Sequence, residues 1–105
     1  MTKVYVSGPI TCASDEQKQN FKTAAVLLHQ LGLTPVVPYD PEDNGEAPYR
    51  SYINEGLLAL MGCDMICLLP GWRDSAGARL EQLYAETVRM PMQFLNKQNG
   101  KVWIG

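Results

Sequence analysis

An almost unbroken apolar run, MICLL at residues 65–69, constrains the fold of this chain more than any other feature. A run of this length without polar alternation is typical of a strand that is buried on both faces of a sheet. Such a strand needs helices on both sides, and helical periodicity is found both before and after the run. Strands that alternate with helices in this way predict an α/β fold with a mostly parallel sheet.

The first half of the chain contains two further expected strands. Lys3–Ser7 (KVYVS) is rich in β-forming residues and stops at a Gly-Pro pair, and residues 33–37 (LTPVV) form the other strand. Between them, Ser14 and Gln17 match a capping box, which predicts the start of a helix. Gly32 is placed to end that helix.

The second half is expected to hold two helices and two weaker strands. One helix follows residues 38–48, a loop rich in Pro, Gly and acids, and the other covers residues 76–89. The strands lie at residues 92–95 and 102–104, separated by a turn at residues 96–100. The apolar stripes that we expect to pack on the sheet are Ile53, Leu57, Leu60 and Met61 in the first helix, and Leu80, Leu83, Tyr84 and Val88 in the second.

The 105 residues fit one domain, residues 1–105, with no room for a second core. We expect a single-domain, Rossmann-like or flavodoxin-like three-layer sandwich with a mostly parallel sheet of four or five strands. In such sheets, ligands bind outside the carboxyl ends of the strands, where the strand order switches. This rule brings residues 7–11, 38–48 and 70–77 around one crevice.

The composition argues against several classes of function. With a formal net charge of −2 and scattered Lys and Arg, the chain lacks the basic patch that binds a nucleic-acid polymer. Three cysteines without CxxC spacing form neither a disulfide framework nor a zinc site, and we expect no metal and no cofactor. No apolar stretch approaches the ~20 residues of a membrane helix, and no signal region starts the chain, so we expect a cytoplasmic protein.

The segment GWRDSAGARLE at residues 71–81 carries the strongest indication of a site. Gly77 weakens the first turn of its own helix with no evident packing gain, which favours close approach of a ligand. Glu81 follows one turn later on the same side of the helix. The residues alone leave two interpretations open, a solvated glutamate or a carboxylate that faces a ligand. For Ser75 the alternative is an ordinary helix cap, and for Gly8 it is a tight turn.

Three segments together change this balance: VYVSGPI near the start, CDMICLLPGW in the middle and DSAGARLE at the start of the last helix. In combination they resemble the nucleoside 2-deoxyribosyltransferase superfamily, and the resemblance runs from Lys3 to about Met92. The likeness is greatest to its short, often phage-borne branch and to the 2′-deoxynucleoside 5′-monophosphate N-hydrolases.

The resemblance implies a glycosidase-type mechanism. Glu81 matches the superfamily's nucleophile, which attacks the anomeric carbon of the sugar and forms a covalent glycosyl–enzyme intermediate. Water or a second base then releases the sugar. Tyr5 matches a strand tyrosine that orients this glutamate in relatives, and the alternative is a core tyrosine.

Two positions bear on the substrate and on the proton for the leaving group. Ser75 matches a serine that binds the 5′-phosphate in the N-hydrolases, where the transferases have an aspartate, so the resemblance favours a monophosphate. The superfamily's acid/base aspartate, eight residues before the acid matched to Asp64, is replaced here by Gly56. Three alternatives follow. Neighbouring Glu55 substitutes for the aspartate, although adjacent helix positions point about 100° apart, or the proton comes from elsewhere, or catalysis is impaired.

We therefore predict an N-glycosidase that acts on a small nucleoside or nucleotide, with hydrolysis slightly favoured over deoxyribosyl transfer. The alternative is a nucleotide-binding module with the same fold and impaired catalysis. A homo-oligomer, most simply a dimer, is expected through a helix surface of Tyr52, Leu58 and Ala59. The predicted catalytic residues are Glu81, Tyr5 and Glu55, and the predicted substrate-binding residues are Ser7, Gly8, Pro9, Ile10, Asp64, Gly71, Trp72, Ser75 and Gly77.

Overall fold

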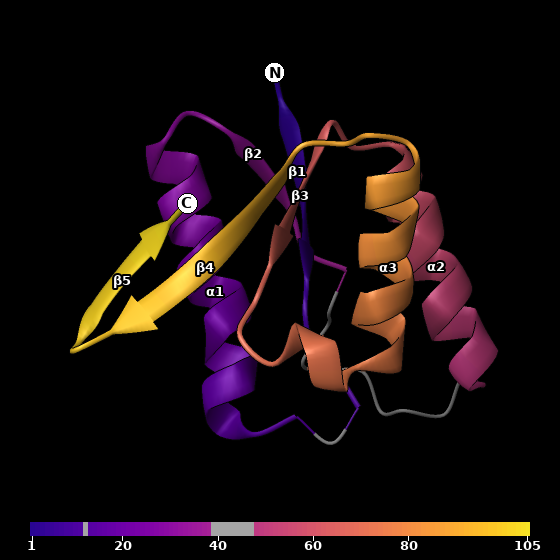
Figure 1. Ribbon diagram of the computed structural model, residues 1–105, viewed down its shortest axis with the longest axis horizontal. Helices are drawn as coiled ribbons and strands as arrows, with labels where there is room; N and C mark the ends of the chain where they lie inside the picture. The colour runs from indigo at the N-terminus through magenta and orange to yellow at the C-terminus, as the bar shows by residue number, and fades with distance from the viewer. Residues whose placement is uncertain (12, 39–47) are drawn as a thin grey trace.

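Five strands form one sheet in the order β2–β1–β3–β4–β5 in the computed structural model of the protein (Figure 1). The structure describes residues 1–11, 13–38 and 48–105, so Cys12 and most of the predicted 38–48 loop lie outside the described residues. β1 to β4 are parallel and β5 is antiparallel to β4, which confirms the predicted α/β class with a mostly parallel sheet. The strands are β1 (Lys3–Ser7), β2 (Thr34–Val36), β3 (Met65–Leu68), β4 (Met92–Gln98) and β5 (Lys101–Ile104).

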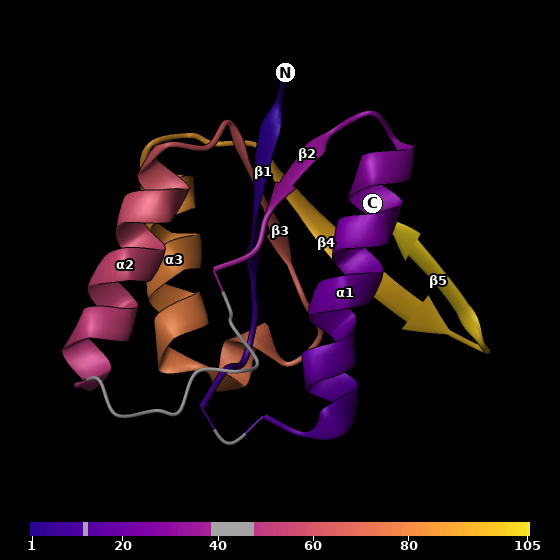
Figure 2. The same cartoon turned by 180° about the vertical axis from the view of Figure 1, so that it is seen from behind.

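Helices cover both faces of this sheet (Figures 1 and 2). They are α1 (Asp15–Gln30) on one face, and α2 (Tyr49–Met61) and α3 (Ala76–Thr87) together on the other. Side chains of β1 alternate between the two layers, as the pleat of a strand requires. Val4 and Val6 lie in the core cluster that contains the α1 residues, whereas Tyr5 lies in the cluster on the α2–α3 side.

Local signals in the sequence account for the start of α1 and for the last turn. Ser14 and Gln17 form the predicted capping box, with each side chain accepting a hydrogen bond from the other residue's backbone N–H. The predicted turn at residues 96–100 was too long, because β4 continues to Gln98. The turn is Asn99-Gly100 alone, with φ of 52° and 76°, as a two-residue hairpin requires.

The predicted inner face of α3 was largely wrong, since of its four residues only Tyr84 packs against the core. Leu80, Leu83 and Val88 are 41%, 56% and 50% exposed. The buried residues of the helix are instead Ala78 and Ala85, and Glu81 lies between them at the same helical spacing. Alanines let the helix axis approach the sheet closely, so α3 turns its small residues inward together with one carboxylate.

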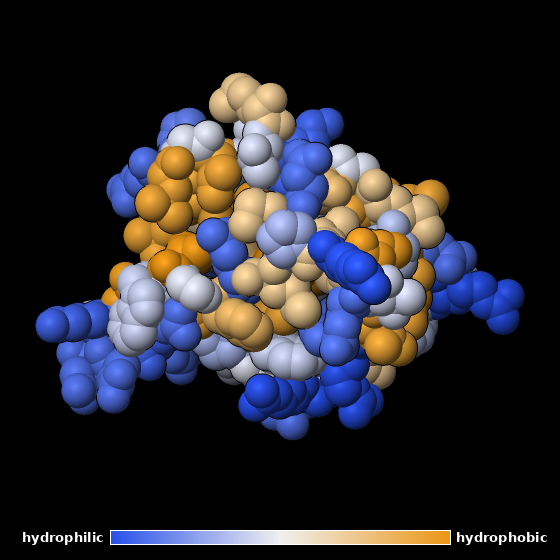
Figure 3. All heavy atoms as spheres, turned by 45° about the horizontal axis from the view of Figure 1, so that its top comes forward, coloured by the Kyte–Doolittle hydropathy of each residue, from blue (hydrophilic) through white to orange (hydrophobic). Residues whose placement is uncertain are grey.

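The outer surface of the α2–α3 layer carries exposed apolar side chains beside charged ones such as Glu55 and Arg79. Leu58 and Met61 of α2 are 68% and 56% exposed, so the predicted inward position of Met61 was also wrong. With Leu80 and Leu83 they form what we call the α2–α3 patch, and Figure 3 shows hydrophobic side chains over these helices and hydrophilic ones at the tip of the β4–β5 hairpin. Among the described residues, no helix combines the length and the apolar character that crossing a membrane would need.

Candidate active site

Glu81 of α3 reaches back to the first strand of the chain. The Tyr5 hydroxyl donates a hydrogen bond to its Oε2 at 2.5 Å, and the Ser7 hydroxyl donates to its Oε1 at 2.7 Å. Both hydroxyls lie on the same face of β1 because they are two residues apart. Each carboxylate oxygen of Glu81 therefore has one hydroxyl donor from β1.

Gly56 of α2 borders the same carboxylate. A Cβ atom built on Gly56 would lie 2.5 Å from Oε2 of Glu81 and 2.8 Å from the Tyr5 hydroxyl oxygen. Gly56 itself is buried. The backbone of α2 thus forms a wall beside Glu81, and any side chain at this position would displace the carboxylate or the tyrosine.

Burial dominates the electrostatics of this group. It raises the pKa of Glu81 above its ordinary value, while the hydrogen bonds from Tyr5 and Ser7 act in the opposite direction because they favour the charged form. The pKa of Tyr5 is raised as well, first by burial and then by the adjacent Glu81. The Tyr5 hydroxyl therefore keeps its proton at neutral pH and remains a donor to the carboxylate.

The first predicted loop is packed against the protein's own residues. A Cβ on Gly8 would lie 2.9 Å from the Leu69 side chain, so internal packing by itself requires a glycine here, whatever its predicted part in binding a ligand. Pro9 is buried and Ile10 is exposed. Gly71 has φ of +86°, and its Cβ would lie 3.3 Å from Pro9. Two of the three loops expected around one crevice, residues 7–11 and 70–77, therefore do meet.

The third loop leads into α3 through a capped helix start. The Ser75 hydroxyl accepts a hydrogen bond from the Ala78 backbone N–H at 3.3 Å, so Ser75 is the N-cap, and its own proton is left to donate elsewhere. Gly77 does have a packing role, contrary to prediction. Its Cβ would lie 3.0 Å from Cδ1 of Ile53, so the missing side chain is explained by contact with α2.

Trp72 and its neighbour form part of the same layer. Trp72 is half-buried and packs against the core cluster that includes Tyr5 and Leu68. The Arg73 guanidinium lies 5.2 Å from the centroid of the indole ring, within the range of a cation–π contact. Part of the indole ring thus belongs to the packed core on the α2–α3 side of the sheet.

Two predicted site residues are not brought to Glu81. Asp64 accepts a hydrogen bond from the Lys3 backbone N–H at 2.9 Å, at the end of the sheet where β1 and β3 begin. Ser7 lies at the opposite end, the carboxyl end of β1. The prediction that Asp64 binds substrate is therefore corrected, and its hydrogen bond instead links the starts of β1 and β3. Glu55 is exposed, and the helix position that faces Glu81 is Gly56.

The sequence did not predict two of the contacts that define this site. One is the bond from Ser7 to Glu81, which the two-residue spacing from Tyr5 signals because both side chains must share a face of β1. The other is the closeness of Gly56 to Glu81. The sequence signal for this contact is a glycine within a helix that also has a buried apolar stripe. We had interpreted Gly56 only as the site of a missing aspartate.

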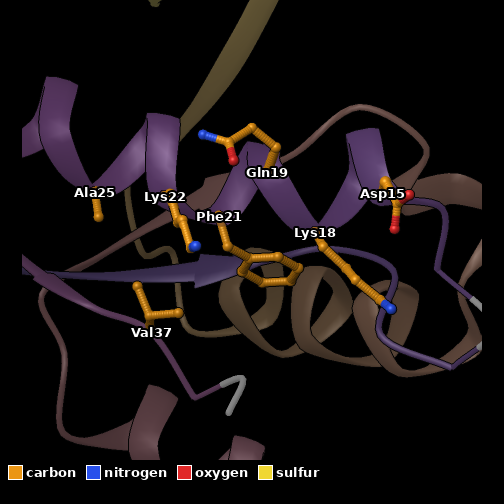
Figure 4. Close-up of a pocket in the computed structure, with 7 residues that line it drawn as sticks. All are labelled: Asp15, Lys18, Gln19, Phe21, Lys22, Ala25 and Val37. Atoms are coloured by element: carbon orange, nitrogen blue, oxygen red, sulfur yellow. The ribbon is translucent and has the colours of Figure 1, made fainter. Parts of the chain in front are cut away.

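A separate hollow lies on the α1 side of the sheet. It has a volume of about 390 Å³, and Figure 4 shows Lys18, Lys22 and Phe21 of α1 around it with Val37, which follows β2. None of the residues that hold Glu81 lines it. Within the part of the chain that the structure describes, no three His, Cys, Asp or Glu residues are grouped as metal ligands would be.

Solved 2-deoxyribosyltransferases have a similar fold. The enzyme of the psychrotolerant bacterium Bacillus psychrosaccharolyticus matches with a TM-score of 0.69 and 20% sequence identity, over 89% of this chain and 71% of its own. That of Leishmania mexicana matches with a TM-score of 0.67 and 17% identity, over 93% of this chain and 66% of its own. The chain therefore has the same fold as these two 2-deoxyribosyltransferases, as the resemblance predicted.

A family model gives a more particular assignment. The model of the domain of unknown function DUF4406 matches residues 2–94, and the chain belongs to this family. A search of curated proteins returned no match. Part of each transferase has no counterpart in this chain, which spans 71% and 66% of their lengths.

Proposed function

We propose that this protein cleaves the N-glycosidic bond of a (deoxy)nucleoside 5′-monophosphate, with Glu81 as the nucleophile. The observation that carries the proposal is the pair of hydrogen bonds from Tyr5 and Ser7 to the two oxygens of Glu81. A glutamate on the surface does not need two such donors. A buried glutamate with only a structural role would destabilise the fold, because burial of a charged group costs free energy. A largely buried carboxylate with two defined donors, one of them at the carboxyl end of a parallel strand, is a candidate for catalysis.

The proposed reaction has two steps. An oxygen of Glu81 forms a bond to C1′ of the sugar while the bond from C1′ to the base nitrogen breaks, and the electron pair leaves with the base, which takes up a proton from water. Water then attacks C1′ of the glycosyl ester and the bond from C1′ to Glu81 breaks, which gives the free sugar phosphate and restores the carboxylate. The proton lost by this water neutralises the hydroxide left by the first step. In a transferase, a second base would replace this water.

Ser75 is the basis for proposing a monophosphate and for favouring hydrolysis. It occupies the N-cap of α3, where backbone N–H groups favour an anion. Its hydroxyl accepts from Ala78 and retains a proton for a phosphate oxygen. The similar folds of the two 2-deoxyribosyltransferases support nucleoside chemistry of the same general kind.

A nucleotide-binding module without turnover is the second candidate. The observation that favours it is Gly56, because the superfamily's acid/base aspartate is absent at this position and Glu55 is exposed. The two candidates differ in one respect, since only the enzyme releases a free base.

The deciding experiment incubates the protein with nucleosides and their 5′-monophosphates, in ribose and deoxyribose forms, and follows release of the base by chromatography. Glu81→Gln should abolish release, because the amide keeps the shape of the side chain and removes its nucleophilic charge. Glu86→Gln is the matched control, since Glu86 is exposed on the same helix. Release of base by the wild type that persists in Glu81→Gln contradicts the mechanism. Ligand-dependent thermal stabilisation without any release favours the binding module.

We also propose a homodimer in the cytoplasm. The α2–α3 patch offers four exposed apolar side chains on one layer of the molecule, which is more than isolated surface positions require. Of the surface predicted for this contact, Leu58 is exposed, while Tyr52 and Ala59 are half-buried. The proposed interface therefore keeps Leu58 and replaces Tyr52 and Ala59 with the other residues of the α2–α3 patch.

A further inference from the structure

The two oxygens of Glu81 have different surroundings. Oε2 is enclosed, because the Tyr5 hydroxyl lies 2.5 Å away and the wall at Gly56 leaves no space for a Cβ atom beside it. Oε1 is bonded to Ser7, the last residue of β1. The carboxyl end of a parallel strand is the edge at which ligands bind in sheets of this kind. Of the two oxygens, Oε1 is therefore the one nearer to that edge.

We propose that Ser7 is a positioning residue that holds Oε1 of Glu81 at the ligand-binding edge and makes it the attacking oxygen, while Tyr5 and Gly56 enclose Oε2. The statement about attack rests on the proposed function, whereas the statement about positioning does not. A carboxylate oxygen accepts more than one hydrogen bond, so Ser7 occupies one lone pair of Oε1 and leaves another for C1′ of the sugar.

This arrangement gives the two hydroxyls different parts in the reaction. When Oε1 bonds to C1′, it becomes the ester oxygen, which is a poorer acceptor, and its bond from Ser7 weakens. Oε2 becomes the carbonyl oxygen of the ester and keeps its bond from Tyr5. Ser7 thus stabilises mainly the free carboxylate, because it favours the charged form and fixes its orientation. Tyr5 donates a hydrogen bond both to the free carboxylate and to the glycosyl ester.

Among the described residues, no charged side chain is a cause of the pKa shift of Glu81, which comes from burial and from the hydrogen bonds of Tyr5 and Ser7. The backbone of α2 at Gly56 borders the carboxylate, and β3, which pairs with β1, contributes Ile66 and Leu68 to the same apolar cluster as Tyr5. Because the hydrogen bond from Ser7 lowers the pKa of Glu81, its removal must raise that pKa.

The test is a carbon-13 NMR titration of the Glu81 side-chain carboxyl in the free protein, which needs no substrate. Ser7→Ala should raise the pKa of Glu81 further, because the charged form loses one of its two hydrogen bonds. Ser7→Thr, which keeps the hydroxyl, should restore the wild-type titration. Ser14→Ala, which removes an exposed capping hydroxyl on α1, is the matched control and should leave it unchanged. If Ser7→Ala does not fold, Ser7→Cys provides a near-isosteric side chain with a weak donor.

Activity provides the second measurement. The acid limb of the pH profile should move to higher pH in Ser7→Ala, because Glu81 must be ionised to attack. Above that limb, Ser7→Ala should lose less activity than Tyr5→Phe. An unchanged titration in Ser7→Ala overturns the positioning role, and a larger loss than Tyr5→Phe above the limb overturns the assignment of Oε1. A shifted titration in a protein that releases no base supports the positioning role and instead overturns the proposed function.

Discussion

Gly56 and Glu81 share a boundary that leaves no room for a Cβ atom, which would lie 2.5 Å from the carboxylate. Gly56→Ala should therefore displace Glu81 and reduce base release at least tenfold, with a stability cost of about 1–3 kcal/mol from overpacking. Gly62→Ala is the matched control, since a Cβ at this exposed glycine makes only an ordinary contact of 3.6 Å. Both variants are compared by base release and by urea denaturation.

Gly56→Asp, which introduces the superfamily's aspartate, should be no more active than Gly56→Ala for the same steric reason. Full activity in Gly56→Asp would contradict the steric argument and would show that position 56 can hold a catalytic acid.

The raised pKa of Glu81 predicts how stability depends on pH. The folded protein holds the Glu81 proton to higher pH than the unfolded chain, so in this interval the folded state binds more protons and stability falls as pH rises. The difference in free energy of unfolding between wild type and Glu81→Gln should thus decrease from about the ordinary value of 4.5 up to the raised pKa.

Urea denaturation of the two proteins over a series of pH values measures this difference. Above the folded pKa the difference should level off, because Glu81 is then ionised in both states. A difference that rises with pH would mean that the donors Tyr5 and Ser7 outweigh burial.

Ser75→Ala should weaken binding of monophosphates more than binding of the corresponding nucleosides. A hydrogen bond to a charged group contributes roughly 1.5–3 kcal/mol, so the affinity for the monophosphate should fall about tenfold to a hundredfold. Calorimetric titration with matched nucleoside and monophosphate pairs gives the comparison.

Ser75→Asp separates this role from helix capping. Aspartate is as good an N-cap as serine, so α3 should keep its stability, but the negative charge should repel a phosphate. Equal losses for nucleosides and monophosphates in Ser75→Ala, with normal monophosphate binding in Ser75→Asp, would leave Ser75 as a cap alone.

The α2–α3 patch predicts a dimer of the 11.7 kDa chain. A charge at the centre of an apolar contact is costly to bury, so Leu83→Glu should give monomers in size exclusion with light scattering. Val26→Glu is the control, because Val26 is 56% exposed on α1, which covers the opposite face of the sheet. A wild-type monomer that is active at micromolar concentration would rule out the dimer as a requirement for the site.

The strands and the mostly parallel character of the sheet could be predicted because they follow from local patterns and from the alternation of strands with helices. The run MICLL required a sheet covered on both faces, and the β-rich segment that ends before Gly8 gave β1 its observed bounds. The turn was overestimated because Asn99-Gly100 was treated as part of a longer polar loop. An Asn-Gly pair between two β-rich segments is itself a hairpin signal.

The site was predicted less completely because its geometry depends on which face of α3 turns inward. Large side chains dominate a reading of periodicity, so Leu80 and Leu83 seemed to define the core face. The inner face is made instead of Ala78, Glu81 and Ala85, and only the tertiary structure shows how closely the helix approaches the sheet. Close packing between α2 and α3 likewise explains Gly56 and Gly77. Their neighbours, Glu81 and Ile53, are distant in sequence.

The hydrogen-bonded partners of Glu81 are 76 and 74 residues away along the chain. A contact of such long range forms only after the intervening elements have been brought together, at a large cost in loop-closure entropy. During synthesis, Tyr5 therefore emerges long before its acceptor, and a chain that stops before α3 would bury a hydroxyl without that partner. The carboxylate meets its two donors only where β1 and α3 are both in place, so these two hydrogen bonds join the first strand of the chain to its last helix.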